Sequence, residues 1–276
     1  MSQLKIFYLC SELKPFSETY NLASFSNRLT SILHAKDDID IRLIKPKYGF
    51  ISERKYILRE VIRLKDMPTE FNDKERLMNI KSAFIPDTRV QVYFLEDEYY
   101  FKPLTQLLYK AKNGRIFNEN DIRYALFAKV ALETLKKLYW KPDVIICNDW
   151  QMSFVPQLLK KYYANDDFYK DIKTLFIIHS FNSYRKFSKK SYKMIELEYD
   201  SKKDSIDNYS SAIKYSDKTM IIDNEDKLIL SGIKSDKTLN KIYKKANHLE
   251  LILPTNASSS DWLKLINSID STLNEL

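Results

Sequence analysis

Glycine is scarce in this chain: its 276 residues include only Gly49, Gly114 and Gly232, against a usual share of about 7%. A Walker loop and a dinucleotide-binding fingerprint both need closely spaced glycines, so the sequence excludes both. The turn that follows the first apolar run, residues 11–21, contains none at all. Backbone N–H groups approach phosphate closely where no Cβ intervenes, so we expect that this turn does not clamp a nucleotide.

Cysteine, histidine and long apolar runs are also rare. Cys10 and Cys147 lie in apolar segments and are predicted to be buried thiols rather than a disulfide or metal site. The three histidines, His34, His179 and His248, lack the spacing to other ligands that a metal site needs, so we expect no metal ion and no cofactor. No apolar run reaches the roughly 18 residues of a membrane span, and a signal-peptide pattern is absent. We therefore expect a cytoplasmic protein.

The charge balance is basic, with 45 lysines and arginines against 37 acidic residues and a formal net charge of +8. A nucleic-acid-binding protein concentrates such charge on one element and interleaves it with exposed aromatic residues. Here basic and acidic residues are mixed along most of the chain. The densest basic run, residues 185–193, is rich in serine and tyrosine, which is typical of a solvated loop, although an anion-binding patch is an alternative.

Apolar runs of strand length recur between helical patterns, which predicts an α/β fold with a single doubly wound, Rossmann-like, mostly parallel sheet. Residues 19–33 and 119–139 place their apolar side chains on one helical face. Residues 55–64 and 77–85 are expected to form an antiparallel pair joined by a polar loop, outside the main sheet. The predicted strands are residues 5–10, 39–44, 90–95, 144–147, 174–178, 218–222 and 248–253.

The end of the chain predicts an amphipathic helix. Ser259, Ser260 and Asp261 provide capping chemistry, and apolar residues then recur at helical spacing from Trp262 to Leu273. We expect one domain over residues 1–257, closed by this helix over residues 258–276, which packs on the same domain. No second domain is expected after it.

Polar residues follow three of the predicted strands at the edge where an open parallel sheet binds ligands. Glu12 follows the first strand, Asn148 and Asp149 follow the fourth, and His179 follows the fifth. If these strands are neighbours, Glu12, Asp149 and His179 converge on one crevice able to hold sugar hydroxyls or a phosphate. Two simpler interpretations stay open: that Asp149 only caps a helix beginning near Gln151, and that His179 is a structural histidine.

Several short motifs occur in a fixed order along the chain. They are Ser11-Glu12-Leu13-Lys14-Pro15-Phe16, Pro46-Lys47-Tyr48, Tyr100-Phe101-Lys102-Pro103, Trp140-Lys141-Pro142-Asp143, Cys147-Asn148-Asp149-Trp150-Gln151 and Ile177-Ile178-His179. This series resembles bacterial glycogen synthases and plant starch synthases. The similarity extends from about Lys5 to about Leu253 and covers the N-terminal half of that family's two-domain glycosyltransferase fold.

The resemblance implies a retaining transfer of glucose from a sugar nucleotide, usually ADP-glucose, to the end of an α-1,4-glucan. It makes His179 the candidate catalytic residue, because His179 aligns with the family's histidine that contacts the donor sugar. Asp149 aligns with the aspartate of the family's Asp-Trp motif. With Glu12, Tyr109 and Asn148, it is expected to contact the substrate.

The donor-binding loop departs from the family's pattern, Lys-Thr-Gly-Gly-Leu-Ala-Asp. The chain has Glu18, Thr19, Tyr20, Asn21, Leu22, Ala23 and Ser24 at these positions. A carboxylate thus replaces the lysine that neutralises the donor phosphate, and it would repel a phosphate about 4 Å away by roughly 1 to 4 kcal/mol. The family's Asn-Gly-Val-Asp hinge is lost near residues 254–256, and the C-terminal domain that supplies most nucleotide contacts is expected to be missing.

Three functions remain open from the sequence. The first is a degenerate glycogen or starch synthase-like domain, a pseudoenzyme that keeps a sugar-binding crevice but is not active alone. The second is a non-catalytic module that binds glucan or has a regulatory role together with a separate protein. A basic nucleic-acid binder is the third and weakest.

Overall fold

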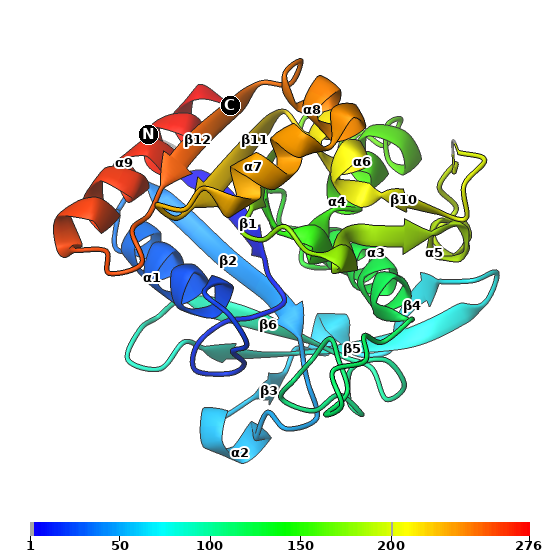
Figure 1. The fold of residues 1–276 in the computed structure, drawn as a ribbon. Helices are drawn as coiled ribbons and strands as arrows, with labels where there is room; N and C mark the ends of the chain where they lie inside the picture. Colours follow the sequence, from blue (N-terminus) through cyan, green and yellow to red (C-terminus); the bar gives the residue numbers. More distant parts are fainter. Residues whose placement is uncertain (1–2, 200) are drawn as a thin grey trace.

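The computed structural model describes residues 3–199 and 201–276, which form a three-layer α/β structure around one ten-stranded sheet (Figure 1). Along the sheet the strands follow the order β12-β11-β8-β7-β1-β2-β6-β5-β3, and β4 pairs with β5. A separate two-stranded ribbon consists of β9 and β10. The strands are β1 Leu4–Leu9, β2 Ile39–Pro46, β3 Arg59–Glu60, β4 Met67–Glu70, β5 Glu75–Phe84, β6 Gln91–Glu96, β7 Val144–Asn148, β8 Lys173–Ile178, β9 Lys186–Ser188, β10 Ser205–Asp207, β11 Lys218–Asp223 and β12 His248–Ile252.

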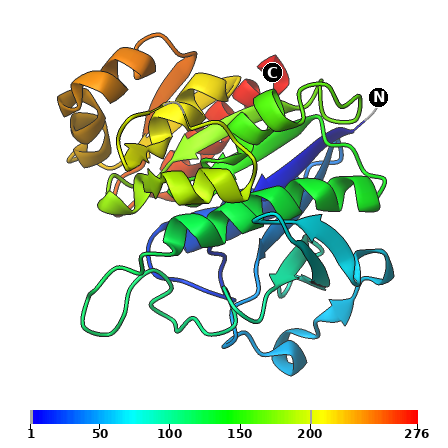
Figure 2. The same ribbon diagram turned by 90° about the vertical axis from the view of Figure 1, so that its right-hand side faces the viewer.

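Helices connect the parallel strands and cover both faces of the sheet. Right-handed crossovers place α1 on one face and α3, α4, α6, α7 and α8 on the other, and Figure 2 shows the long α3 lying across the sheet. The helices are α1 Leu22–His34, α2 Glu53–Tyr56, α3 Asn120–Lys137, α4 Val155–Gln157, α5 Lys189–Met194, α6 Asn208–Tyr215, α7 Leu228–Ser235, α8 Lys237–Tyr243 and α9 Ser259–Glu275. The short turns are η1 Ile62–Leu64, η2 Trp150–Met152, η3 Leu158–Tyr162 and η4 Ser183–Arg185.

The seven strands predicted from the apolar runs all lie in this sheet, and β12, β11, β8, β7, β1, β2 and β6 pair in parallel. The predicted doubly wound α/β fold is therefore confirmed. The two cysteines are buried free thiols, as expected from their apolar surroundings. Burial raises the pKa of the Cys10 thiol to about 12.

The predicted antiparallel pair is only partly correct. Residues 59–60 do pair with β5, at Lys81 and Ser82. The longer partner of β5 is β4, residues 67–70, within the segment that was expected to be a polar loop. Met67 and Thr69 are buried there while their neighbours are exposed, so a short alternating pattern of period two was overlooked. β5 also pairs antiparallel with β6, which joins this excursion to the main sheet.

Helix α9 packs beside α1 and near the end of the sheet formed by β12 and β11 (Figure 1). Its N-terminus has a capping box made by Ser258 and Asp261. Its apolar stripe is buried, and its side chains contact α1: the Arg28 guanidinium lies 4.5 Å from the Trp262 ring centroid. The buried residues of this helix are Leu265, Ile266, Ile269, Thr272 and Leu273.

Candidate functional site

The strands that carry the predicted site residues are neighbours in the sheet. β1 pairs with β7, and β7 pairs with β8, all in parallel, so the ends of these strands meet at one edge. His179 Nε2 lies 3.0 Å from Asn148 Oδ1, and the His179 backbone N–H donates to Asp149 Oδ1 at 3.2 Å. The structure thus brings Asn148, Asp149 and His179 into direct contact, while Glu12 lies in an adjoining cluster.

Glu12 is fully buried, and its carboxylate is held by hydroxyl groups. Tyr109 Oη donates to Oε1 at 2.6 Å and Thr19 Oγ1 donates to the same oxygen at 2.7 Å. The Thr19 backbone N–H donates to Oε2. Burial raises the pKa of Glu12, and the hydrogen bonds from Tyr109 and Thr19 oppose that rise. The predicted pair Glu12 and Tyr109 therefore forms a hydrogen-bonded unit, closed on one side by Thr19.

Asp149 is also fully buried, with a backbone φ of 62°, a left-handed conformation that costs a non-glycine residue about 1 to 3 kcal/mol. Its carboxylate does not cap η2, so the simpler interpretation of Asp149 as a helix cap is wrong. Tyr209 Oη donates to Oδ1 at 2.5 Å, while Ser180 Oγ and Tyr20 Oη donate to Oδ2 at 2.7 and 2.8 Å. Burial raises the pKa of Asp149, and these hydrogen bonds oppose the rise.

His179 presents a neutral imidazole. Its ring packs 4.6 Å from the ring of Phe25, and burial lowers its pKa to about 3. The amide of Asn148 donates to the backbone oxygen of Leu9 at 2.9 Å, which leaves Asn148 Oδ1 as the acceptor facing His179 Nε2. The proton of the neutral ring is accordingly on Nε2, and Nδ1 is a free acceptor.

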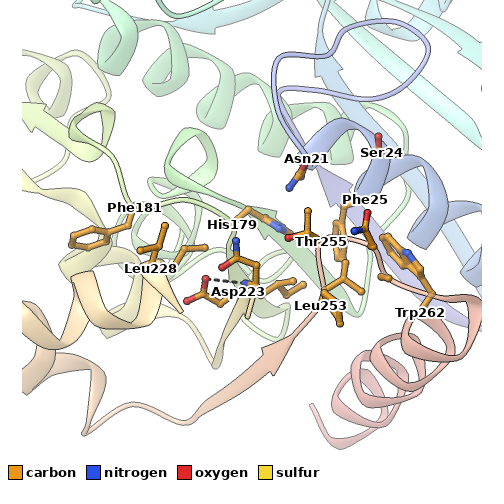
Figure 3. Close-up of a pocket in the computed structure, with 16 residues that line it drawn as sticks. Asn21, Ser24, Phe25, His179, Phe181, Asp223, Leu228, Leu253, Thr255 and Trp262 are labelled. Carbon is orange, nitrogen blue, oxygen red and sulfur yellow. Dashed lines mark hydrogen bonds between the residues drawn. The ribbon is translucent and has the colours of Figure 1, made fainter. Parts of the chain in front are cut away.

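His179 lines a cavity of about 570 Å³ beside α9, which we call the α9 cavity. Figure 3 shows Phe25 and Trp262 at one end, Phe181 and Leu228 at the other, and His179 and Thr255 between them. The lining residues are Asn21, Ser24, Phe25, His179, Phe181, Ile222, Asp223, Asn224, Leu228, Ile229, Leu253, Pro254, Thr255, Asn256, Ala257 and Trp262. This lining, all of it within the described chain, includes a carboxylate but neither lysine nor arginine.

A second cavity, of about 590 Å³, lies on the other side of the same loop, and we call it the aromatic cavity. The rings of Trp150 and Tyr184 stack at 5.4 Å with an interplanar angle of 29°, and Tyr109 meets Trp150 edge to face at 5.1 Å. The lining residues are Glu18, Thr19, Tyr20, Gln106, Leu107, Tyr109, Lys110, Trp150, Ser180, Asn182 and Tyr184. Aromatic faces and short polar groups therefore dominate its surface.

The altered loop forms part of the wall between the two cavities. Tyr20 lines the aromatic cavity, whereas the next residue, Asn21, lines the α9 cavity together with Ser24. Helix α1 begins at Leu22 rather than at Thr19 as predicted, because Thr19 and Tyr20 bind Glu12 and Asp149 instead of entering the helix. Glu18 points outward, where it pairs with Lys14 at 2.7 Å.

Three residues that the sequence interpretation did not assign to the site also take part. Tyr209 of α6 binds Asp149, Tyr184 stacks on Trp150, and Trp262 of α9 closes one end of the α9 cavity. The sequence pattern places Trp262 in an apolar helical stripe, and Tyr184 directly precedes the serine- and tyrosine-rich basic run of residues 185–193. No local pattern around Tyr209 distinguishes it from the other tyrosines of the chain.

Two negative findings concern the described residues. Among them, no group of three or more histidine, cysteine, aspartate or glutamate side chains is placed to hold a metal ion. None of the helices in residues 3–199 and 201–276 is both long and apolar enough to cross a membrane.

The fold is that of a glycosyltransferase-type α/β domain. The structure is similar to the catalytic domain of starch synthase IV from Arabidopsis thaliana, solved bound to ADP and acarbose, with a TM-score of 0.75 and 22% sequence identity. The similarity covers 91% of this chain and 52% of that one.

The starch synthase catalytic domain family model matches residues 5–225, and the chain belongs to this family. It is 38% identical over 181 residues to a glycogen synthase of Pelodictyon phaeoclathratiforme, and 37% identical over 181 residues to one of Chlorobium limicola. Each match covers 66% of this chain and spans only 36% of the relative. The resemblance inferred from the ordered motifs is thereby confirmed.

Proposed function

We propose that this domain binds an α-1,4-glucan in the aromatic cavity and does not by itself transfer glucose from ADP-glucose. One observation carries the proposal: the two cavities that flank the altered loop differ in chemistry. The aromatic cavity offers stacked rings and polar groups with one charge of each sign, Glu18 and Lys110, whereas the α9 cavity lacks a basic side chain in its lining.

The aromatic cavity suits a sugar chain for a physical reason. Sugar rings have apolar C–H faces that pack on aromatic rings, while their hydroxyls need fixed donors and acceptors nearby. Tyr184, which is half-buried and stacks on the buried Trp150, supplies the ring surface, and Ser180, Asn182 and Gln106 supply polar groups. The structural neighbour from Arabidopsis thaliana was solved with acarbose bound, which supports a carbohydrate as the ligand class here.

The α9 cavity is a poor site for a sugar nucleotide. A diphosphate brings negative charge, and the ionisable side chains of this lining are the acidic Asp223 and the imidazole of His179. At about 4 Å, each like-charge contact costs roughly 1 to 4 kcal/mol at effective dielectric constants from 80 to 20. His179 does not compensate, since burial keeps its imidazole neutral. We infer that donor affinity is the step at which synthase activity fails.

His179 remains the candidate catalytic residue if any transfer takes place. Its Nε2–H is committed to Asn148, so Nδ1 is available to accept a hydrogen bond from a hydroxyl of a bound sugar. This is a positioning contact that needs no charge on the ring. Transfer would therefore require a donor held in the α9 cavity by groups other than a lysine or arginine of its lining.

Calorimetry with maltoheptaose and, separately, with ADP-glucose tests the proposal. We expect glucan binding in the millimolar to micromolar range and no measurable donor binding, together with no glucose incorporation into the glucan. Incorporation that His179→Ala abolishes would show instead an active synthase. Absence of maltoheptaose binding to the folded protein would remove the glucan-binding function.

A further inference from the structure

The phenol of Tyr20 makes the hydrogen bonds that a sugar hydroxyl would make. Tyr20 Oη donates to Asp149 Oδ2 at 2.8 Å and accepts from Gln151 Nε2 at 3.2 Å. Asp149 and Gln151 are both fully buried. Gln151 Oε1 is buried without a hydrogen-bond partner among the described residues, so this side chain has unused capacity to bind a further donor.

We propose that Asp149, Gln151 and Ser180 form a binding position for a hydroxyl group of a neutral, polyhydroxylated ligand, and that Tyr20 occupies this position in the free protein. The inference builds on the proposed glucan function, because the same ligand class fills the adjoining aromatic cavity. It adds an internal competitor for the ligand, contributed by the altered loop.

The other groups that hold Asp149 are fixed parts of the fold. Tyr209 is buried on α6 and donates to Oδ1, and the backbone N–H groups of His179 and Ser180 donate to the same oxygen. Tyr20 differs because it lies in a loop, is only half-buried and lines the aromatic cavity. Tyr20 is therefore the donor to Asp149 that can leave with the least disturbance to the sheet.

The position of Tyr20 also explains why the two cavities are separate. Tyr20 and Ser180 line the aromatic cavity, while Asn21 and His179, their chain neighbours, line the α9 cavity. Removing the phenol should extend the aromatic cavity towards Asp149 and His179. A terminal sugar ring could then replace the Tyr20 hydroxyl on Asp149 and Gln151. An anionic ligand is disfavoured there, because the carboxylates of Asp149 and Glu12 lie in the same buried region.

The first test compares maltoheptaose affinity in three proteins. Tyr20→Gly should bind about tenfold more tightly than the unaltered protein, as expected when an internal competitor is removed. Tyr20→Phe keeps the ring in the same place and should not bind more tightly. Tyr56→Phe is the matched control, since Tyr56 Oη, at the end of α2, also donates a hydrogen bond, to the backbone oxygen of Pro15 at 2.9 Å. Equal or weaker binding by folded Tyr20→Gly would overturn the inference.

A second test does not depend on glucan binding. In Tyr20→Gly, p-cresol should refill the vacated position and raise the melting temperature more than toluene, which has the same ring without the hydroxyl. Replacing Gln151 as well, with Gln151→Met, should remove that preference. Equal stabilisation by the two compounds would refute the hydroxyl-binding position, even if the glucan assay fails for another reason. If Tyr20→Gly does not fold, Tyr20→Ser takes its place in the assay. The expected result is again a larger rise in melting temperature with p-cresol than with toluene.

Discussion

The aromatic cavity and the α9 cavity share the wall formed by the altered loop, yet they differ in the origin of their linings. The first is lined by Trp150 of the Asp-Trp motif and by Tyr109, and also by Glu18 and Tyr20 of the altered loop. The second is lined by His179, by Asn21 and Ser24 of the altered loop, by residues 254–257 and by Trp262 of α9. The altered loop thus contributes to both linings, and the cavities differ most clearly in the stacked rings of Trp150 and Tyr184, which belong to the first.

The largest expected effect concerns α9, which closes the altered side. Ile269 is fully buried, and Ile269→Ala should destabilise the protein by about 2 to 5 kcal/mol, because it removes buried methyl groups and leaves a cavity. Leu263 on the same helix is 60% exposed, and Leu263→Ala should change stability by no more than about 0.5 kcal/mol. Urea unfolding measures both. If Ile269→Ala changes the free energy of unfolding as little as Leu263→Ala does, α9 does not belong to the same folded domain as residues 1–257.

A pair of aromatic substitutions distinguishes the two cavities directly. Tyr184→Ala removes the ring stacked on Trp150 and should weaken maltoheptaose binding by about 1.4 to 2.8 kcal/mol, or tenfold to a hundredfold. Phe181→Ala removes a ring from the α9 cavity and should leave that affinity unchanged. Calorimetry on both folded variants is the measurement. If Phe181→Ala weakens binding as much as Tyr184→Ala, the glucan occupies both cavities and the contrast between them fails.

The sequence was sufficient to predict the parts of the site that lie at strand ends. Asn148, Asp149 and His179 directly follow buried apolar runs, and the carboxyl ends of parallel strands meet at one edge. The sequence did not show that these strands are neighbours. The structure shows it, because β7 pairs with both β1 and β8. The same predictability extended to the fold class, because seven apolar runs alternate with helical patterns.

The remaining contacts depend on distant segments, for which a local pattern gives no signal. The bond from Tyr20 to Asp149 joins residues 129 positions apart, and that from Tyr209 to Asp149 joins residues 60 positions apart. Helical spacing predicts that Trp262 packs in the core, but the same spacing is found in a helix that lines a cavity. The start of α1 was placed too early because helical periodicity does not reveal that Thr19 and Tyr20 bind buried carboxylates.

The pH dependence of stability should identify His179 as a neutral group beside the α9 cavity. Its pKa of about 3 in the folded protein lies below the usual value of about 6.5. The unfolded chain therefore binds a proton that the folded protein excludes, and stability is lost as the pH falls from about 6.5 towards 3. Between pH 7.5 and 5 the loss should be about 1 to 2 kcal/mol, and His179→Gln should remove it.

Urea unfolding at several pH values compares the unaltered protein with His179→Gln. His248→Gln serves as the control for loss of a histidine, because His248 is exposed on β12. An identical pH dependence in the unaltered protein and His179→Gln would mean that the pKa of His179 is the same in the folded and unfolded states. The α9 cavity would then gain a cation below about pH 6.5, and the argument against donor binding would weaken at acidic pH.

The smallest expected effect comes from rebuilding the altered loop. The combined variant Glu18→Lys, Tyr20→Gly and Asn21→Gly restores a cation and removes two side chains, so ADP-glucose affinity should rise by about 1 kcal/mol, roughly fivefold. A larger gain is not expected, because Asp223 remains and the rest of the α9 lining adds no basic group. Glu18→Gln with the same two glycines is the matched control for charge. If ADP-glucose affinity stays unchanged, the defect in donor binding lies outside the loop. If the affinity reaches micromolar values, the loop alone accounts for the loss of donor binding.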